Sequence, residues 1–187
     1  AFVNEEIVPY ADQYDQEERT PPELIKTLAE KGYLGGFIPK EHGGDGMDIL
    51  TYGLLCEEIG RGSASLASLM TVHGMVCQAL MKWGSATQKA HWLPKLATGE
   101  TIGAFGLTEP NIGSDAKSVE TTAVLADNTY CLNGQKKWIS FGQVADLFLI
   151  IAQCEGKPAA FLVEKNTEGF STQPMNNLLG FRAAMLA

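Results

Sequence analysis

The sequence has 187 residues, of which 45% are hydrophobic, so it can supply the core of one domain or of two small ones. Its 14 Lys and Arg are outnumbered by 22 Asp and Glu, which gives a formal net charge of −8. A surface that binds nucleic acid or anionic lipid needs clustered basic side chains, and the sequence has no such cluster. We therefore expect a folded protein that binds no nucleic acid and does not insert into membranes.

Four cysteines, Cys56, Cys77, Cys131 and Cys154, have none of the spacings of a zinc site, and we expect no metal. Buried free thiols in a reducing compartment fit them best, although the sequence leaves a disulfide bridge open. The first residues do not have the pattern of a signal peptide, and no segment has the pattern of a lipid-facing span. These features predict a cytoplasmic protein.

The first half of the chain has helical periodicity. Thr20 and Glu23 have the spacing of a capping box, and the helix that they predict ends at Gly32. Asp48 can cap a second helix, which runs to about Gly60. Local signals thus define two helices before the middle of the chain.

A third predicted helix carries almost no charge and has one apolar face. The residues of this face recur at spacings of three and four: Leu66, Leu69, Met70, His73, Val76, Cys77, Leu80 and Met81. We expect this helix to be central and a short helix over 87–97 to follow it. Neither His73 nor the other histidines, His42 and His91, have partners at metal-ligand spacing, so we interpret all three as ordinary core or surface residues.

After Gly99 the sequence changes to short runs of β-branched and aromatic residues. Six runs have the pattern of strands, namely 102–107, 119–125, 129–132, 135–140, 147–152 and 159–163. Asn133-Gly134 is the signal of a type I′ hairpin between two of them. Helices followed by strands predict an α+β fold, with a helical domain over 1–101 and a β domain over 102–187.

One candidate binding segment is the run 105–115. A strand ends at Thr108, a proline holds the next residue extended, and Gly113-Ser114 makes a turn. Backbone N–H groups and two hydroxyls would then face one direction. Such a turn can hold an anion or a heteroaromatic edge, and it can equally be a purely structural turn.

A second candidate segment is Lys137-Trp138-Ile139-Ser140. If this segment is a strand, the alternation of side chains places Trp138 and Ser140 on the same face. An aromatic plane beside a hydroxyl group suits a flat cofactor as well as it suits a hydrophobic core. The two interpretations remain open at this point.

Together these motifs resemble those of the acyl-CoA dehydrogenase family, and the likeness covers nearly the whole chain. In chain order the matching motifs are Glu41-His42-Gly43-Gly44-Asp45-Gly46, Trp92-Leu93-Pro94-Lys95-Leu96-Ala97-Thr98-Gly99-Glu100, Leu107-Thr108-Glu109-Pro110 with Gly113-Ser114-Asp115, Leu132-Asn133-Gly134, Lys137-Trp138-Ile139-Ser140, Phe161-Leu162-Val163-Glu164-Lys165 and Leu179-Gly180-Phe181-Arg182. So many motifs in the order of one family make a chance match implausible.

The resemblance implies a helical N-terminal domain, a middle domain that is an antiparallel, barrel-like β structure, and a C-terminal helical bundle that this chain lacks. It also implies FAD as cofactor, bound between the first two domains. Phe105, Leu107 and Thr108 match the strand whose backbone and hydroxyl contact the pyrimidine edge of the flavin. Negative charge builds at that edge on reduction, and donors placed beforehand stabilise it.

Three further positions match cofactor contacts of the family. Ser114 matches the hydroxyl near the FAD pyrophosphate, Trp138 the ring packed along the isoalloxazine, and Ser140 the hydroxyl that faces flavin N5. The family's reaction removes the α-proton of an acyl thioester with a Glu while the β-hydride passes to N5. That Glu is expected in the C-terminal domain, so no catalytic residue is assigned here, and we interpret Glu109 as a structural carboxylate.

The resemblance also implies a homodimer or homotetramer, because a neighbouring subunit normally helps to complete the FAD site. The electron acceptor is not predicted. The chain begins at Ala1 rather than Met and ends at Ala187, from which we expect a piece of a longer protein.

Three positions depart from the family pattern and bear on the substrate. Ala184 and Leu186 stand where Ser and Thr usually follow Gly-x-Arg, and Phe141 stands where Asn is frequent. Members that oxidise acyl groups on a carrier protein, including those that make polyketide extender units, look similar here. The alternatives are therefore an acyl-CoA thioester, an acyl-carrier-protein thioester and, in another class, a non-catalytic, oxidase or monooxygenase relative.

Overall fold

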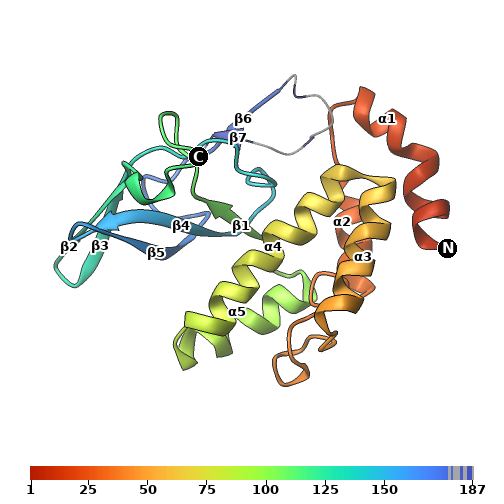
Figure 1. The fold of residues 1–187 in the computed structure, drawn as a ribbon, viewed down its shortest axis with the longest axis horizontal. Helices are drawn as coiled ribbons and strands as arrows, with labels where there is room; N and C mark the ends of the chain where they lie inside the picture. Colours follow the sequence, from red (N-terminus) through yellow and green to blue (C-terminus); the bar gives the residue numbers. More distant parts are fainter. Residues whose placement is uncertain (177, 179–181, 183–184, 187) are drawn as a thin grey trace.

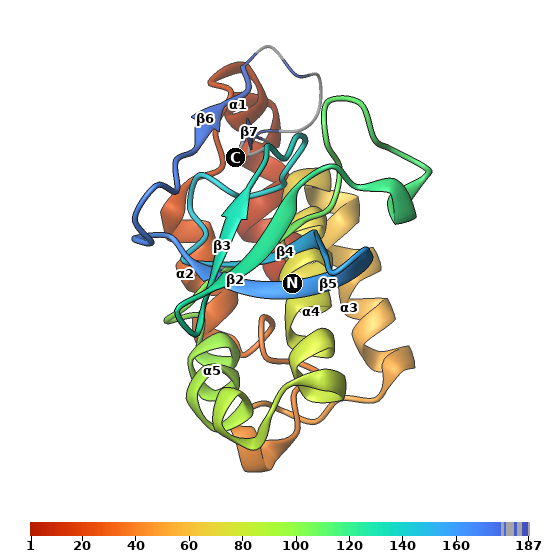
Figure 2. The ribbon, with the colours of Figure 1, turned by 90° about the vertical axis from the view of Figure 1, so that its left-hand side faces the viewer.

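The computed structural model describes residues 1–176, 178, 182 and 185–186 of the chain. The helices come first in the sequence and lie together, and the strands that follow form a sheet beside them (Figure 1). Seen from the side of the sheet, the strands lie in front of the helical layer (Figure 2). This arrangement confirms the predicted α+β class.

The helical part consists of five α-helices and of shorter turns between them. The α-helices are α1 (Ala11–Gln16), α2 (Pro22–Glu30), α3 (Ile49–Gly62), α4 (Ala64–Trp83) and α5 (Ala86–Thr98). The shorter helical turns are Val3–Ile7, Val8–Tyr10, Lys40–His42 and, in the β part, Ala116–Ser118. The helices predicted from local signals are therefore present.

Helix capping follows the sequence at one of the two predicted positions. The Asp48 carboxylate accepts a hydrogen bond of 2.9 Å from the N–H of Thr51 and caps α3 as expected. The capping box predicted at Thr20 is wrong, because the following proline takes the N-cap position of α2. The chain does contain a capping box, formed by Ser85 and Gln88 at the start of α5.

Helix α4 is the central helix that its apolar face predicts. Its buried side chains include seven of the eight predicted residues, and only Met81 is partly exposed. Among the described residues, α4 is the one helix that is long and apolar enough to cross a membrane, but 56% of its most apolar window is buried in the molecule. The core helix of a globular protein has the same character.

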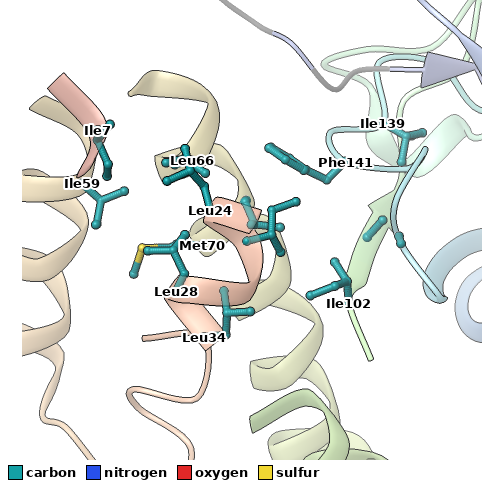
Figure 3. Packing of buried hydrophobic residues seen from close by; sticks show 14 of the residues in the cluster. Ile7, Leu24, Leu28, Leu34, Ile59, Leu66, Met70, Ile102, Ile139 and Phe141 are labelled. Atoms are coloured by element: carbon teal, nitrogen blue, oxygen red, sulfur yellow. The ribbon is translucent and has the colours of Figure 1, made fainter. Parts of the chain in front are cut away.

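One hydrophobic core extends from the helices into the β part of the chain. Leu24 from α2 and Leu66 from α4 lie on one side of this core, while Ile102 and Phe141 reach it from the other (Figure 3). Burying an aliphatic or aromatic side chain of this size stabilises the fold by about 1.5–3 kcal/mol relative to leaving it exposed. The helices and the segment around Phe141 are therefore held by shared contacts.

The main sheet is mixed and not antiparallel throughout. Its five strands are β1 (Gly103–Gly106), β2 (Thr122–Ala126), β3 (Thr129–Asn133), β4 (Leu147–Cys154) and β5 (Lys157–Glu164). Strand β4 pairs with β5 and β2 with β3 in antiparallel fashion, but β1 and β2 both run parallel to β4. Within this sheet, the expected antiparallel pairing thus holds only for the two hairpins. A separate pair, β6 (Gln173–Pro174) and β7 (Met185–Leu186), is antiparallel.

The hairpin predicted at Asn133-Gly134 is wrong. The two tight turns of the sheet are made by four residues with positive φ, namely Asp127, Asn128, Glu155 and Gly156. Gly134 instead packs closely on Thr121, where an added Cβ would lie 2.4 Å from the Thr121 hydroxyl oxygen. A close backbone approach, and not a turn, requires this glycine.

The strand predicted over 135–140 is also absent, because this segment pairs with no strand. Free thiols are found as expected, since all four cysteines are unbridged. Only Cys77 is buried, however, while Cys131 is exposed on β3, so the expectation of buried thiols is wrong for most of them.

Candidate functional site

The two candidate segments of the sequence lie side by side in the fold. The first follows β1 and the second follows β3, and the N–H of Lys137 donates a hydrogen bond of 2.8 Å to the C=O of Thr108. This bond places Trp138 one residue away from a direct contact with the first segment. Residues almost thirty positions apart in the sequence are thereby neighbours.

The Trp138 segment has a strained backbone. Trp138 has a φ of 62° and Phe141 a φ of 57°, in the left-handed region that bulky residues rarely adopt. Each such residue costs on the order of 1–3 kcal/mol and persists only when its surroundings hold it there. Strain of this kind concentrates at sites where a side chain must be presented in one direction.

The surroundings that hold the segment are apolar. Ile139 and Phe141 are each 1% exposed and point into the core shared with the helices (Figure 3). Trp138 is 48% exposed and Ser140 is half-buried, so both remain accessible. The Lys137 ammonium lies 4.9 Å from the centre of the Trp138 ring. The predicted pairing of Trp138 with Ser140 on a strand is wrong, yet both residues stay outside the core.

Phe141 was one of the departures from the family pattern. Because the Phe141 side chain is buried in the core shared with the helices, the presence of Phe in place of the frequent Asn does not indicate whether the acyl group is carried by CoA or by a carrier protein. Ala184 lies outside the described residues, and of Leu186 only the backbone is described.

A buried ion pair links the first segment to the residue that precedes the second segment. The Lys136 ammonium is 2.6 Å from a Glu109 carboxylate oxygen, and the two side chains are 4% and 1% exposed. The same oxygen accepts hydrogen bonds from the N–H (2.9 Å) and hydroxyl (2.5 Å) of Thr121, and the other oxygen accepts one from the N–H of Glu120. One carboxylate oxygen thus accepts three hydrogen bonds and the other accepts one, so donors occupy both oxygens.

These contacts decide the ionisation of Glu109. Burial by itself would raise its pKa, but the hydrogen bonds from Lys136, Thr121 and the backbone of 120–121 outweigh burial and lower the pKa to about 2. Glu109 is therefore ionised at neutral pH, and buried donors already occupy both of its oxygens. This geometry fits the interpretation of Glu109 as a structural carboxylate.

The remaining predicted site residues differ in their surroundings. Phe105, on β1, is half-buried against the apolar cluster of α4 and α5. Leu107 is half-buried, and its C=O accepts a hydrogen bond of 3.2 Å from Lys136. Ser114 is exposed on the loop between β1 and β2, and within the described residues no hydrogen bond joins it to Thr108 or Trp138. Hydrogen bonds therefore join the segments that carry Leu107, Thr108 and Trp138, and Ser114 takes no part in them.

His73 is the structural histidine that the sequence suggested. It is fully buried, its Nε2 lies 3.1 Å from the C=O of Leu96, and its Nδ1 accepts a 3.1 Å hydrogen bond from the N–H of Gly103. Burial lowers the pKa of His73 to about 4, although the hydrogen bond to Leu96 opposes the shift. A neutral imidazole thus fixes the start of β1 against α4 and the end of α5.

A separate cavity of about 250 Å³ lies between α1, α2 and the turn from α3 to α4. Arg182, at its edge, binds the Asp15 carboxylate with N–O distances of 2.6 and 2.7 Å. None of the six predicted cofactor contacts lines this cavity. We find no group of three or more metal-ligating side chains among the residues that the structure describes.

Sequence reasoning missed Lys136 altogether. The available signal was a single glutamate, Glu109, in one largely apolar motif and two adjacent lysines, Lys136 and Lys137, at the start of the other. Unmatched charges in two apolar segments favour a buried pair, because burying either charge alone is costly.

Comparison with known proteins gives a consistent result. The family models "Acyl-CoA dehydrogenase, N-terminal domain" and "Acyl-CoA dehydrogenase, middle domain" match residues 1–100 and 104–187. A short-chain specific acyl-CoA dehydrogenase of Clostridium acetobutylicum is 38% identical over 98% of this chain and 50% of its own length. An acryloyl-CoA reductase (NADH) of Anaerotignum propionicum is 40% identical over 100% of this chain and 49% of its own length.

Solved structures agree with these relatives. A glutaryl-CoA dehydrogenase from Mycobacterium smegmatis in complex with FADH2 superposes with a TM-score of 0.93 at 34% identity, over 99% of this chain and 48% of that one. The chain spans about half the length of the curated relatives it matches. It therefore belongs to the acyl-CoA dehydrogenase family, of which it carries the N-terminal and middle domains.

Proposed function

We propose that this chain supplies the flavin-binding side of an FAD-dependent dehydrogenase of acyl thioesters. The observation that carries the proposal is the strained, half-exposed Trp138, which a backbone hydrogen bond from Lys137 to Thr108 holds beside the end of β1. Family membership, and a relative solved with FADH2, support the same conclusion.

The residues present have the chemistry that FAD requires. A flat heteroaromatic ring needs an aromatic surface, donors at its polar edge and a rigid support. Trp138 offers an accessible aromatic ring, and Thr108 and Ser140 offer hydroxyl groups on the two joined segments. The support is rigid because Ile139 and Phe141 are anchored in the core.

In this proposal, six residues of the chain hold the cofactor: Phe105, Leu107, Thr108, Ser114, Trp138 and Ser140. The first three bind the pyrimidine edge, where fixed donors stabilise developing negative charge. Ser114 binds the pyrophosphate, which fits its exposed position on the loop between β1 and β2. Bound FAD supplies the acceptor for the substrate hydride.

We assign no general base to this chain. Glu109 is unsuited to that role because its pKa is lowered to about 2 and donors occupy both of its oxygens. The base is proposed to be a Glu of a C-terminal domain, and a homodimer or homotetramer is proposed to complete the FAD site.

The carrier of the acyl group separates two versions of the proposal. We favour a CoA thioester, since the relatives described above are named for CoA thioesters. An acyl-carrier-protein thioester is the alternative, and it rests on the sequence at Ala184 and Leu186 and on the likeness of the stretch 68–75 to such members.

The test is the anaerobic absorbance of bound flavin in the complete protein. The protein is mixed separately with a panel of acyl-CoAs and with the same acyl groups loaded on a carrier protein. Bleaching by CoA thioesters is the expected result, and bleaching by carrier-bound thioesters alone would establish the alternative. Bound flavin that no thioester bleaches would contradict the dehydrogenase and favour an oxidase, monooxygenase or non-catalytic relative.

A further inference from the structure

The buried ion pair of Glu109 and Lys136 does more than neutralise two charges. The Lys136 ammonium, 2.6 Å from Glu109, also donates to the C=O of Leu107 at 3.2 Å. The C=O end of the Leu107–Thr108 peptide group is thereby held in place by Lys136. Neither Glu109 nor Lys136 is among the six proposed cofactor contacts.

Because a peptide group is planar, this contact also fixes the direction of the Thr108 N–H. The described chain contains no cis peptide bond. In a trans peptide, the C=O of one residue and the N–H of the next point in opposite directions. Because the C=O of Leu107 is directed at Lys136, the N–H of Thr108 is directed away from the ion pair. The following C=O, that of Thr108, is fixed as well, since it accepts the N–H of Lys137 at 2.8 Å.

Glu109 is held from several directions at once. Besides Lys136, its donors are the N–H and hydroxyl of Thr121 and the N–H of Glu120. The pair therefore joins three segments of the chain, 107–109, 120–121 and 136–138, at one buried point. A displacement of Lys136 would loosen the peptide groups on both sides of Thr108.

We propose that Glu109 and Lys136 are positioning residues that fix the Thr108 N–H as a donor to the pyrimidine edge of the flavin. The inference rests on the flavin site proposed above and assigns a role to residues that do not themselves contact the cofactor. A donor fixed before the cofactor binds needs no reorganisation when negative charge develops at that edge. Losing this orientation should both weaken FAD binding and lower the reduction potential of the bound flavin.

The test compares Glu109→Gln, Lys136→Met and the double variant in the complete protein. Each single variant leaves one buried group without its charged partner, so it should lower the Tm and weaken FAD binding about tenfold, which corresponds to about 1.4 kcal/mol. The double variant removes both charges and should regain most of the lost Tm. It should not regain FAD affinity or reduction potential, because methionine at position 136 cannot donate to the C=O of Leu107.

Tyr52→Phe is the matched control. Its hydroxyl donates a buried hydrogen bond of 3.0 Å to the C=O of Met70, within the helical part. This variant should also lower the Tm, but it should leave the FAD dissociation constant and the flavin potential as in the unmodified protein.

Two results would overturn the inference while leaving the proposed function standing. One is recovery of FAD affinity and potential together with Tm in the double variant, which would show that the pair is purely structural. The other is single variants that bind FAD with unchanged affinity. An unmodified complete protein that binds no FAD would instead overturn the proposed function, and this inference with it.

Discussion

Trp138 and Thr108 are the residues on which the proposed cofactor site depends most. Trp138→Ala should weaken FAD binding by roughly 5- to 150-fold, because stacking of a flat base on an aromatic side chain contributes about 1–3 kcal/mol. Thr108→Ala should weaken it less, because it removes one hydroxyl hydrogen bond, worth about 0.5–1.5 kcal/mol. The measurement is a titration of the apo form of the complete protein with FAD, followed by flavin fluorescence.

The control for Trp138→Ala is Trp83→Ala. Trp83 is 74% exposed at the end of α4, so its loss removes an aromatic ring that the proposed site does not use. Unchanged FAD affinity is expected for Trp83→Ala. Equal affinities for the Trp138 and Trp83 variants would contradict the assignment of Trp138.

His73 gives the protein a specific dependence of stability on pH. Its pKa is about 4 in the folded protein and 6.5 in the unfolded chain, so the unfolded chain binds the proton more readily. The stabilisation is complete above pH 6.5 and is lost as pH falls from 6.5 towards 4. With 1.36 kcal/mol per pKa unit, the loss amounts to about 3 kcal/mol.

Urea unfolding between pH 4 and 7 measures this dependence. His73→Asn should lose stability at neutral pH and show a shallower fall on acidification than the unmodified protein. His91→Asn, at an exposed position on α5, should keep the original slope. An unchanged slope in the His73 variant would show that other groups cause the pH dependence.

At the scale of elements, Gly134 shows how a glycine supports the ion pair. A Cβ at Gly134 would lie 2.4 Å from the hydroxyl oxygen of Thr121 and 2.6 Å from its Cα. The N–H and hydroxyl of Thr121 both donate hydrogen bonds to Glu109. Gly134→Ala should therefore displace Thr121, the residue before β2, and destabilise the fold by about 1–3 kcal/mol.

Gly113→Ala is the comparison for this prediction. No atom lies within 4 Å of a Cβ added at Gly113, so its replacement should change the free energy of unfolding by less than about 0.5 kcal/mol. Chemical unfolding of both variants measures the difference. Equal stabilities would mean that the contact of Gly134 with Thr121 relaxes without cost.

The elements differ in how far the sequence predicts them. Helices α3 and α4 follow from local signals, because the Asp48 cap and the apolar face of α4 act within a few residues. The tight turns were not predicted correctly. Asn133-Gly134 is the stronger local turn signal, but Gly134 is required by its close approach to Thr121 and not by a turn. That contact exists only once the sheet has formed.

The candidate site was predictable to a similar degree. The sequence motifs mark the segments around Thr108 and Trp138 as candidate binding segments. The strand expected over 135–140, however, does not form. The core contacts of Ile139 and Phe141 override the β propensity of this segment and hold Trp138 at a positive φ. The pairing of Glu109 with Lys136 depends on the meeting of two segments, which no local pattern encodes.

At the scale of the whole molecule, the shared core couples the helices to the candidate site. Phe141→Ala removes a fully buried side chain and should cost about 3–5 kcal/mol of stability. Because Phe141 packs in one cluster with Leu66 on α4 and Ile102 beside β1, hydrogen exchange should rise in both elements. Leu125→Ala, on the exposed face of β2, should change neither. Faster exchange confined to one element would show that the two parts are not coupled through this core.

The most direct test of the central claim is a crystal structure of the complete protein with FAD. We expect the isoalloxazine ring to lie against Trp138, with its pyrimidine edge at the N–H and hydroxyl of Thr108. Flavin bound elsewhere on the chain, or an isoalloxazine ring that contacts neither Trp138 nor Thr108, would contradict it.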